Sequence, residues 1–335
     1  MTTTPEKMAR INPQNISLME SFLREKDIRS ATGTVDGYRS DLNIFFVYVL
    51  DHLENKFFVD IRKLEFAEYF NFCVNELQWN SARFNRMRSC LSSMSNFIEK
   101  YLDDMYPSFR NAILKVIETM PLSAAREKTI LSENQVNLLL QHLMDTNRKQ
   151  EACLVAPAVA SGARASELLR FRTDIIDLNN LVYSGVFIET TEMIKTKGRT
   201  KSGDLKYKYI IKSIFDKYYT AWMTEREEIL RKTGQSHNYL FIRHDGVPAT
   251  TSTIRNWIPE WETFLGVNVY AHAFRHYTVT FLTRMGLPSD LIVELMGWKS
   301  SEMYKIYNDL TSKDREWKEL DAMKEYLKSE VVHDI

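Results

Sequence analysis

Hydrophobic residues recur at the spacing of an α-helix through the first third of the chain. In the clearest case, over residues 34–50, one face of the predicted helix carries Val35, Tyr38, Leu42, Phe45 and Phe46. The same kind of pattern predicts further helices over residues 15–23, 64–77, 81–100 and 109–116. The sequence shows no strand-like alternation before residue 120. We therefore predict an all-helical first domain that spans residues 13–119.

The pattern changes after a polar, lightly charged stretch over residues 120–130, which is typical of a linker. Helical periodicity then resumes and predicts helices over residues 134–144, 151–161, 167–172, 213–232, 251–264, 272–285, 288–296 and 314–328. Residues 175–211 are rich in β-forming side chains, residues 205–210 alternate as one strand would, and Gly198 and Ser202-Gly203-Asp204 predict hairpin turns. The expected fold is mainly α with a small antiparallel β-sheet, and the second domain spans residues 131–335.

The composition is that of an ordinary globular protein. Hydrophobic residues make up 44% and charged residues 26% of the 335-residue chain, which excludes a disordered protein. The 44 basic and 44 acidic side chains cancel, but between residues 193 and 212 seven basic side chains face only one acidic residue, Asp204. This local excess is either a solvated surface or a contact for a polyanion.

Several classes of protein are excluded by what the sequence lacks. The longest apolar run, residues 44–50, is too short to span a bilayer, and the first seven residues lack the apolar core of a signal peptide. Three widely spaced cysteines, Cys73, Cys90 and Cys153, form neither a disulfide framework nor a four-cysteine zinc site. The sequence also lacks a glycine-rich phosphate loop and a His-Glu-x-x-His motif. We expect a cytoplasmic protein without membrane segments, metal or other cofactor.

Four short segments of the second half stand out chemically: Arg164 two residues after Gly162, His272 with Arg275, Gly297-Trp298, and the pair Tyr304 and Tyr307. His272 and Arg275 are three residues apart, so they share one face of a predicted helix. Each segment taken alone is also typical of a surface arginine, a buried histidine or a core tyrosine. Residues 281–298 are also compatible with a helix-turn-helix.

Taken in order, these segments resemble the motifs of the tyrosine recombinase (phage integrase) family. The first arginine box of the family is Gly-x-Arg-x-x-Glu-Leu, and this chain matches it with Gly162, Arg164, Glu167 and Leu168. The second box is His-x-x-Arg-His, and the chain matches it with His272, Arg275 and His276. The third motif is usually Gly-His and less often Gly-Trp in the family, and here it is Gly297-Trp298. The family's tyrosine lies nine residues after this motif, which selects Tyr307 over Tyr304. The first half resembles the helical core-binding (SAM-like) domain, and the chain from residue 131 resembles the catalytic domain.

The resemblance implies site-specific DNA recombination, in which DNA is cut and rejoined through a 3′-phosphotyrosyl bond. Tyr307 would attack the scissile phosphate, and Arg164 and Arg275 would clamp its non-bridging oxygens. His272 would hydrogen-bond the phosphate or assist proton movement, and Trp298 would donate through its indole N–H. Because the phosphotyrosyl bond stores the energy of the broken diester, the reaction needs neither ATP nor a metal.

In the family the general acid is a lysine of the β-hairpin, and the long hairpin of this chain offers two candidates. Lys201, before Ser202-Gly203, matches the Lys-Thr/Ser-Gly form, and we prefer it because its offset to the closing strand is closer to that of the family. Lys197, before Gly198, matches the Gly-Lys-Gly form and stays open as the alternative. Nearby cations lower the pKa of an ammonium, which suits it to donate a proton. Glu167 is expected to order the groups near the first arginine without taking part in catalysis.

Double-stranded DNA is the partner that the resemblance implies, held by both domains as a clamp. The residues expected to contact it are Tyr38, Arg39, Arg83, Asn85, Arg86 and Arg88 in the first domain and Lys195, Lys197 and Arg199 in the hairpin. Asn85 is the candidate base reader. For each of these residues, a solvated protein surface is the alternative interpretation.

The resemblance also implies a homotetramer on two duplexes with inverted-repeat half-sites. Only about a dozen residues precede the first predicted helix, so we expect the simple Xer- or Cre-like architecture without an arm-binding domain. The predicted helix over 314–328 carries Trp317, Leu320, Met323 and Leu327 on one stripe. We expect this helix to dock on a neighbouring subunit, and docking on its own subunit is the alternative.

Two other functions share parts of this pattern. A DNA-binding regulator that kept the fold would have lost at least one catalytic residue, and the sequence retains Arg164, Arg275, Tyr307 and a hairpin lysine. A type IB-like topoisomerase would share the chemistry, but the C-terminal tail favours an assembling recombinase. The target sequence, the need for accessory proteins, and the choice among integration, excision, inversion and dimer resolution stay open.

Overall fold

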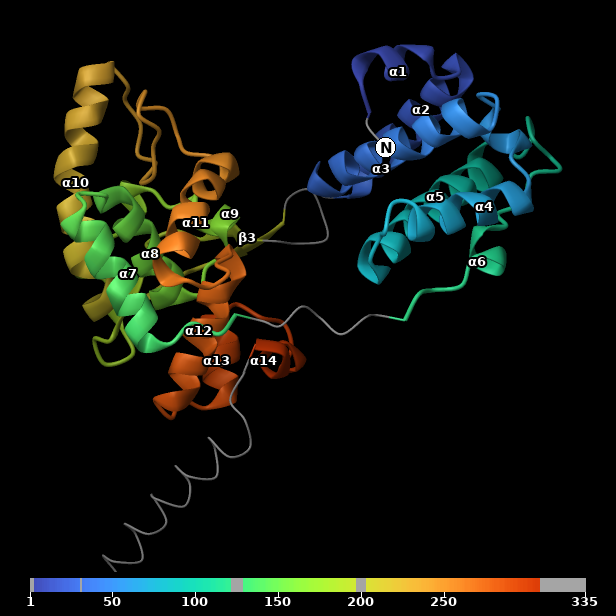
Figure 1. The fold of residues 1–335 in the computed structure, drawn as a ribbon. Helices are drawn as coiled ribbons and strands as arrows, with labels where there is room; N and C mark the ends of the chain where they lie inside the picture. Colours follow the sequence, from blue (N-terminus) through green and yellow to red (C-terminus); the bar gives the residue numbers. More distant parts are fainter. Residues whose placement is uncertain (1–2, 31, 122–128, 197–202, 308–335) are drawn as a thin grey trace, which may run out of the picture. The chain divides into compact units, whose positions relative to one another are not determined.

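The computed structural model describes residues 3–30, 32–121, 129–196 and 203–307. The chain forms two compact units, of which the first holds the described residues 3–30 and 32–121 and the second the described residues 129–196 and 204–307 (Figure 1). Each unit has its own hydrophobic core. The described residues are mainly α-helical with small antiparallel sheets, which confirms the predicted fold class. Among these residues, no helix combines the length and the apolar character needed to cross a membrane.

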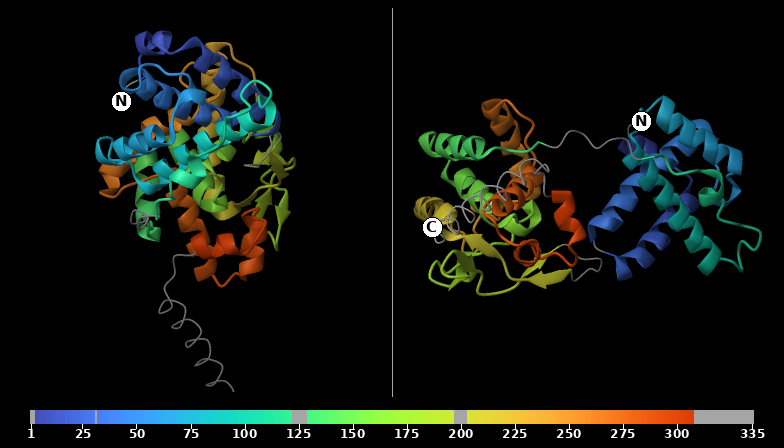
Figure 2. Two further views of the ribbon diagram at one scale, coloured as in Figure 1. Left: turned by 90° about the vertical axis from the view of Figure 1, so that its right-hand side faces the viewer. Right: turned by 90° about the horizontal axis from the view of Figure 1, so that it is seen from below.

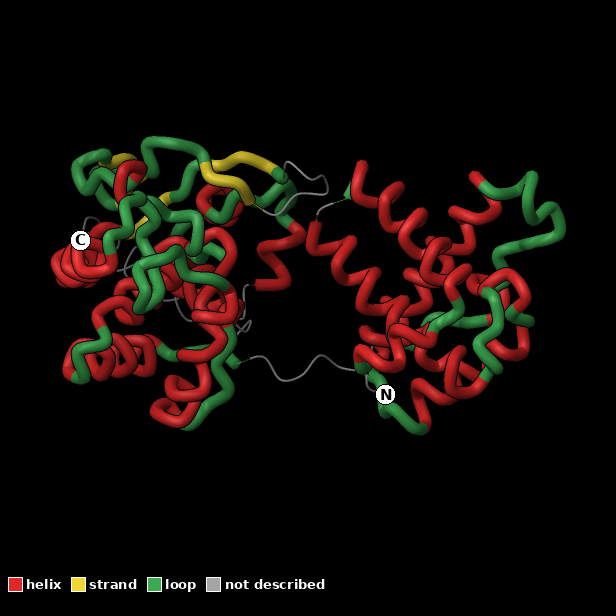
Figure 3. The backbone as a smooth tube through the Cα atoms, turned by 90° about the horizontal axis from the view of Figure 1, so that it is seen from above, coloured by secondary structure: helices red, strands yellow, loops and turns green. Residues whose placement is uncertain are grey.

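The first unit consists of helices and their connections, and none of its described residues lies in a strand (Figure 3). Its elements are α1 (Pro5–Arg10), α2 (Pro13–Arg29), α3 (Thr32–His52), the 3-10 helix η1 (Phe58–Asp60), α4 (Lys63–Asn75), α5 (Ser81–Tyr101) and α6 (Ile113–Val116). The five predicted helices are confirmed, with α2 longer and α6 shorter than predicted. Helix α1 was missed because none of its residues is buried, so it has no apolar stripe.

Aromatic rings fill the core of the first unit. Phe45, in the middle of α3, packs against Phe66 with ring centroids 5.8 Å apart and against Tyr69 with centroids 4.9 Å apart. Both partners belong to α4, so the burial of Phe45 joins two helices. Each fully buried large apolar side chain stabilises a fold by roughly 1.5–3 kcal/mol. The apolar stripe over residues 34–50 is therefore the one that organises this unit.

The second unit is built around α8 (Lys149–Ser161), whose residues from Glu151 to Ser161 are all buried. Helices α7 (Glu133–Asp145), α10 (Lys212–Thr233) and α12 (Ala271–Arg284) pack against α8. The other helices among its described residues are α9 (Ala165–Leu168), the 3-10 helix η2 (Thr173–Ile175), α11 (Thr251–Leu265), α13 (Ser289–Leu295) and α14 (Glu302–Tyr307). Helices α12, α13 and α14 contact one another and form one end of the unit (Figures 1 and 2).

Two small antiparallel sheets lie in the predicted β-rich zone. One has the strand order β1 (Leu181–Val182), β2 (Phe187–Glu189), β5 (Tyr209–Ile211), and the other is a hairpin of β3 (Ile194–Thr196) and β4 (Asp204–Lys206). In the hairpin, Lys195 lies opposite Leu205, which confirms that residues 194–206 form a hairpin. The predicted turn residues Gly198 and Ser202 lie outside the described residues.

The expectation of one strand over residues 205–210 is wrong. The run divides between β4 and β5, which belong to different sheets, with Tyr207 and Lys208 between them. Lys208 lies in this run, and its side chain is 3% exposed and ion-paired with Glu167. A buried partner far away in the sequence thus overrides the period-2 pattern.

All three cysteines are buried as free thiols. Burial raises the pKa of Cys73 to about 12, with a small opposing contribution from Tyr69 and Arg83. A thiol with such a pKa is protonated at neutral pH and unreactive. The cysteines therefore serve packing, two in the first unit and one in α8.

Candidate active site

The two predicted arginines come from different elements of the second unit. Arg164 is the N-cap residue of α9, two residues after Gly162, which ends α8 in the left-handed conformation. Arg275 lies in α12, is 1% exposed, and donates from Nη1 to the carbonyl of Gly162. Its Nη2 donates to the carbonyl of Met296 at 3.1 Å. One buried guanidinium thus joins the turn of the first arginine box to the turn before Trp298.

Gly162 is required at this turn for two reasons. Its φ of +59° lies in the region that side chains rarely adopt. A Cβ at this position would also lie 2.8 Å from the Met296 Sδ. Helix α12 is held against the same turn by Thr278, whose Oγ1 donates to the Val159 carbonyl at 3.0 Å. The local geometry therefore brings α8, α9 and α12 together around the arginines.

A buried carboxylate holds Arg164. Glu167 is 0% exposed, and its Oε1 accepts from Arg164 Nη1 at 2.7 Å, while its Oε2 accepts from the Arg164 backbone N–H at 3.1 Å. Lys208 Nζ donates to Oε2 at 2.7 Å. Burial alone would raise the pKa of Glu167, but Lys208 and Arg164 outweigh it and lower that pKa to about 2. The carboxyl is thus ionised throughout the physiological range.

Burial, and next to it the charge of Arg164, lower the pKa of Arg275 to about 10. The guanidinium is still protonated at neutral pH, so the two arginines place two positive charges close together. Glu167 offsets part of their repulsion, and the positive charge that remains is suited to bind an anion such as a phosphate.

Tyr307 closes the cluster from the last turn of α14. Its side chain is 8% exposed, and its ring centroid lies 4.6 Å from that of His276 and 5.2 Å from that of Trp298. The Arg275 guanidinium lies 5.6 Å from the Tyr307 ring centroid and 5.1 Å from that of Trp298. The structure therefore brings together Arg164, Arg275, Trp298 and Tyr307. It also adds His276, to which the sequence assigned no role.

Two residues that the sequence analysis singled out, His272 of the second arginine box and Tyr304, lie in other surroundings than the residues of this cluster. His272 is exposed near the start of α12, one turn before Arg275. Tyr304 turns to Thr283, with 3.1 Å between their hydroxyl oxygens. The selection of Tyr307 over Tyr304 stays a prediction.

Two donors of the cluster have no hydrogen-bond partner among the described residues. They are Arg275 Nε and Trp298 Nε1, both buried. A buried donor left without an acceptor costs about 1–3 kcal/mol, and such groups are retained mainly where function needs them. Both N–H groups are suited to an acceptor such as a phosphate oxygen.

The family model described as the phage integrase family matches residues 129–314. The chain belongs to the phage integrase family. The assignment confirms the recognition made on the sequence, and with it a tyrosine recombinase that carries out site-specific DNA recombination by cutting and rejoining DNA.

Two relatives illustrate the membership. The chain is 24% identical over 288 residues to the SPbeta prophage-derived recombinase-like protein YomM of Bacillus subtilis, covering 83% of this chain and 81% of YomM. It is 23% identical over 302 residues to the tyrosine recombinase XerC of Pediococcus pentosaceus, covering 88% of this chain and 93% of XerC.

Solved structures share the fold. The Tn1549 transposon integrase in complex with transposon right-end DNA matches with a TM-score of 0.64 at 16% identity, over 92% of this chain and 99% of that one. The XerH recombinase bound to a palindromic difH substrate matches with a TM-score of 0.62 at 19% identity, over 86% of this chain and 79% of that one.

The hairpin lysines of this phage integrase family member fall largely outside the described residues. Lys197, Arg199 and Lys201 lie in the segment 197–202, and Lys195 is exposed on β3. Both strands at the root of the hairpin are anchored beside the motifs. The backbone carbonyl of Lys195 accepts from Arg170 Nη1 at 3.2 Å, two residues beyond the first arginine box, and Asp204 pairs with Lys299 at 2.9 Å. The residues that carry these anchors were missed because neither belongs to a family motif.

In the first unit, two of the predicted DNA contacts form internal ion pairs. Arg83 and Arg86 of α5 both pair with the fully buried Asp41 of α3. Gly37 makes room for this contact, because a Cβ there would lie 2.6 Å from the Arg86 Nη2. Arg86 is half exposed at 50%, so part of its guanidinium still faces solvent.

Two more of the predicted DNA contacts, Asn85 and Arg88, form hydrogen bonds with backbone groups of the first unit. The Asn85 amide donates to the Met120 carbonyl at 2.8 Å and accepts from the Met120 N–H at 3.0 Å. Arg88 donates to the carbonyls of Leu114 and Ile117. Both side chains therefore hold the end of the first unit against α5. As DNA contacts they stay predictions.

The last two predicted contacts lie on α3. Arg39 forms a bidentate pair with Glu20 of α2, with Nη2 donating at 2.9 Å. Tyr38 stacks on Phe22, with ring centroids 5.9 Å apart. These contacts orient both side chains without burying them completely.

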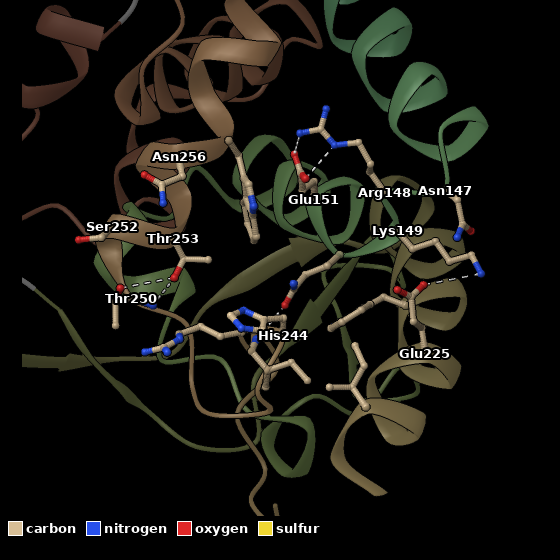
Figure 4. A pocket seen from close by; sticks show the side chains of 16 residues that line it. Asn147, Arg148, Lys149, Glu151, Glu225, His244, Thr250, Ser252, Thr253 and Asn256 are labelled. Atoms are coloured by element: carbon tan, nitrogen blue, oxygen red, sulfur yellow. Dashed lines mark hydrogen bonds and ion pairs between the residues drawn. The ribbon is translucent and has the colours of Figure 1, made fainter. Parts of the chain in front are cut away.

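A separate polar pocket of the second unit lies between α8, α10 and α11 (Figure 4). In it, Arg148 pairs with the buried Glu151, and Lys149 pairs with Glu225. Glu151 also accepts from the Trp261 indole at 2.8 Å, which ties α11 to α8. None of the arginines or tyrosines of the candidate active site lines this pocket.

Proposed function

We propose that Tyr307 is the nucleophile of this recombinase. Its phenol oxygen attacks the scissile phosphorus, the bond to the 5′-oxygen breaks, and a 3′-phosphotyrosyl bond and a free 5′-hydroxyl form. The observation that carries the proposal is the position of Tyr307 against the buried Arg275 and Trp298, in a described cluster that also includes Arg164 of the first arginine box. Attack of another strand's 5′-hydroxyl on the same bond reverses the chemistry and rejoins DNA.

Arg164 and Arg275 bind the two non-bridging oxygens and offset the charge that builds up in the transition state. Two features support this role. Both side chains are positively charged, and the Nε of Arg275 has no hydrogen-bond partner among the described residues. Trp298 donates its indole N–H to a phosphate oxygen and shields the site with its ring. His272, exposed at the same end of α12, hydrogen-bonds the phosphate or accepts the proton from Tyr307.

Lys201 protonates the departing 5′-oxygen, with Lys197 as the alternative. The anchors at the root of the hairpin support a hairpin acid, since they hold Lys195 close to the first arginine box and Asp204 close to Gly297-Trp298. A variant in which Lys201 is replaced by alanine should be rescued by DNA with a 5′-bridging phosphorothiolate, whose sulfur leaves without a proton. If only the corresponding Lys197 variant is rescued, the acid is Lys197.

The DNA target has inverted-repeat half-sites, and the protein acts on it as a tetramer in the cytoplasm, on nucleoid DNA. The first domain and the hairpin contact the duplex through the predicted residues Tyr38, Arg39, Arg83, Asn85, Arg86, Arg88, Lys195, Lys197 and Arg199. The predicted helix 314–328, which lies outside the described residues, links neighbouring subunits. XerH, with its palindromic difH substrate, supports the symmetry of the target by analogy of fold.

The test begins with selection of bound duplexes from random or host-derived fragments. On the selected duplex, wild type and Tyr304→Phe should form a covalent protein–DNA adduct on a denaturing gel, and Tyr307→Phe should bind but form none. An adduct that persists in Tyr307→Phe would overturn the assignment of the nucleophile. Failure to enrich any duplex, or enrichment without an adduct for wild type, would overturn the proposed function.

A further inference from the structure

Lys208 is a buried cation that the mechanism above does not use. It lies between β4 and β5, and its side chain is only 3% exposed. Both of its ends are held, since its backbone N–H donates to Thr190 Oγ1 at 3.1 Å and its Nζ donates to Glu167 Oε2 at 2.7 Å. A lysine is rarely buried unless it is paired, so this placement needs a reason.

The reason lies in the way Glu167 is shared. Its Oε2 receives Lys208 Nζ and the backbone N–H of Arg164, and its Oε1 receives the Arg164 guanidinium at 2.7 Å. All these partners are donors, so the carboxyl must be ionised to accept from all of them. A protonated carboxyl would present an O–H to one of the donors and release Arg164 from its orientation.

We propose that Lys208 is a positioning residue for strand cleavage, which holds Glu167 as a carboxylate and thereby orients Arg164 toward the phosphate. It acts through Glu167 and does not touch DNA. Its ammonium is directed at a buried carboxylate, so it is not the acid for the leaving oxygen, a role that stays with the hairpin lysine. The inference rests on the proposed function, because it assigns Arg164 to the phosphate.

The charges around Glu167 determine what the loss of Lys208 should do. Three cations surround this carboxyl: Lys208 and Arg164 bind it directly, and Arg275 lies close enough to interact with it electrostatically. Burial favours the protonated carboxyl, and Lys208 is the larger of the two cationic effects that keep it ionised. Removing Lys208 therefore raises the pKa of Glu167. Cleavage should then become faster as the pH rises and Glu167 ionises, a dependence that wild type lacks.

The experiment measures single-turnover formation of the covalent adduct on the selected duplex at saturating protein, from about pH 5.5 to about pH 9. The variants are Lys208→Met, Lys208→Arg and the double variant Lys208→Met/Glu167→Gln. The matched control is Lys56→Met, because Lys56 pairs with Glu65, another buried carboxylate whose pKa is about 2, in the first unit. Duplex binding, read by gel shift, should stay within about twofold of wild type for all four, since the substituted groups are buried or remote from the arginines.

At low pH, Lys208→Met should form adduct on the order of 10- to 100-fold more slowly than wild type, the loss typical when a group that orients an active-site ligand is removed. Its rate should recover as the pH rises. The double variant should be slow at every pH, because it has no carboxyl to titrate. Lys208→Arg and Lys56→Met should follow the wild-type profile.

A Lys208→Met profile parallel to that of wild type would overturn the proposal, and so would a double variant that keeps the new titration. If Lys208→Met does not fold, the double variant decides, since it removes both buried charges together. Its cleavage at the wild-type rate would show that the pair is not needed. If wild type itself forms no adduct, the proposed function fails and this inference falls with it.

Discussion

The two units of the chain use the same ionic arrangement at the start of a helix, with different consequences. In each, an arginine at the N-cap is followed three residues later by a glutamate, and a lysine from elsewhere completes the set. The helical-unit trio is Lys56, Arg62 and Glu65, and the active-site trio is Arg164, Glu167 and Lys208.

The contacts within the two trios correspond closely. Each glutamate accepts from the backbone N–H of its N-cap arginine, at 2.8 Å for Glu65 and 3.1 Å for Glu167. Each also accepts from the guanidinium of that arginine, at 3.1 and 2.7 Å, and from the lysine. In both, burial opposes ionisation and the partners outweigh it, so both pKa values are lowered to about 2.

Exposure separates the two trios. The side chain of Arg62 is 75% exposed and that of Lys56 34%, whereas Arg164 is 22% and Lys208 3% exposed. Arg62 therefore ends in water, but Arg164 ends beside the buried guanidinium of Arg275. The same Arg-x-x-Glu cap stabilises a helix in one unit and, in the mechanism we propose, also orients Arg164 toward the phosphate in the other. Surroundings, and not the cap itself, make the difference.

The sharpest way to break this comparison is to remove each arginine. Arg164→Ala should slow adduct formation by roughly 10²- to 10³-fold, as expected when one donor to a transition-state oxyanion is lost. Arg62→Ala should leave the rate unchanged. The measurement is single-turnover cleavage of the selected duplex. Equal losses in both variants would mean that Arg164 acts only as a cap.

Removing the lysine of each trio should lower the free energy of unfolding of the two units by different amounts. Loss of one partner from a buried pair costs about 3–5 kcal/mol, so Lys208→Met should weaken the second unit by that order. Lys56 is partly exposed, and Lys56→Met should weaken the first unit by about 1 kcal/mol or less. Hydrogen exchange read by mass spectrometry resolves the two units in the intact chain. A larger effect at Lys56 would show that exposure does not set the strength of these pairs.

The sequence could predict the arginine of the active-site trio but not its lysine. Arg164 and Glu167 are neighbours in one helix turn, and their spacing carries a family motif. Lys208 is 41 residues from Glu167 and lies in an alternating run that looks like a solvated strand. Only the folded chain shows that this run divides so that the lysine turns inward. Pairings across long sequence separations leave no local pattern.

Helices were predicted where an apolar stripe faces a core, as in α3, α5 and α12, and missed where it does not. Helix α1 buries no residue, and the short α14, over which no helix was predicted, buries only Tyr307. For Asn85 and Arg88, the sequence indicated polar groups on a helix but not their partners. Those partners are backbone groups of the segment 114–120, which no side-chain pattern reveals.

Acid should weaken both trios in the same direction. The pKa of each glutamate is about 2 in the folded chain and about 4.3 when unfolded. Their stabilisation is therefore complete above the unfolded value and is lost as the pH falls toward 2. Melting temperatures of Glu65→Gln and Glu167→Gln should differ from wild type most at neutral pH, with a gap that narrows below about pH 4. A gap that widens in acid would contradict the lowered pKa values.

The smallest effect is expected for an ion pair whose N–O distance is similar to those in the trios but whose side chains are more exposed. Lys299 pairs with Asp204 at 2.9 Å, with side chains 75% and 34% exposed, and joins the hairpin to the turn after Trp298. Exposed pairs of this kind contribute about 0.2–1 kcal/mol, because water screens the charges and two flexible side chains must be ordered. A double-mutant cycle with Lys299→Ala and Asp204→Ala, read by urea unfolding, should give a coupling energy in that range. The coupling should also shrink in high salt, whereas the Lys208–Glu167 pair, shielded from ions, should change little. A coupling as large as that of the buried pair would mean that distance alone, and not burial, decides the strength of these contacts.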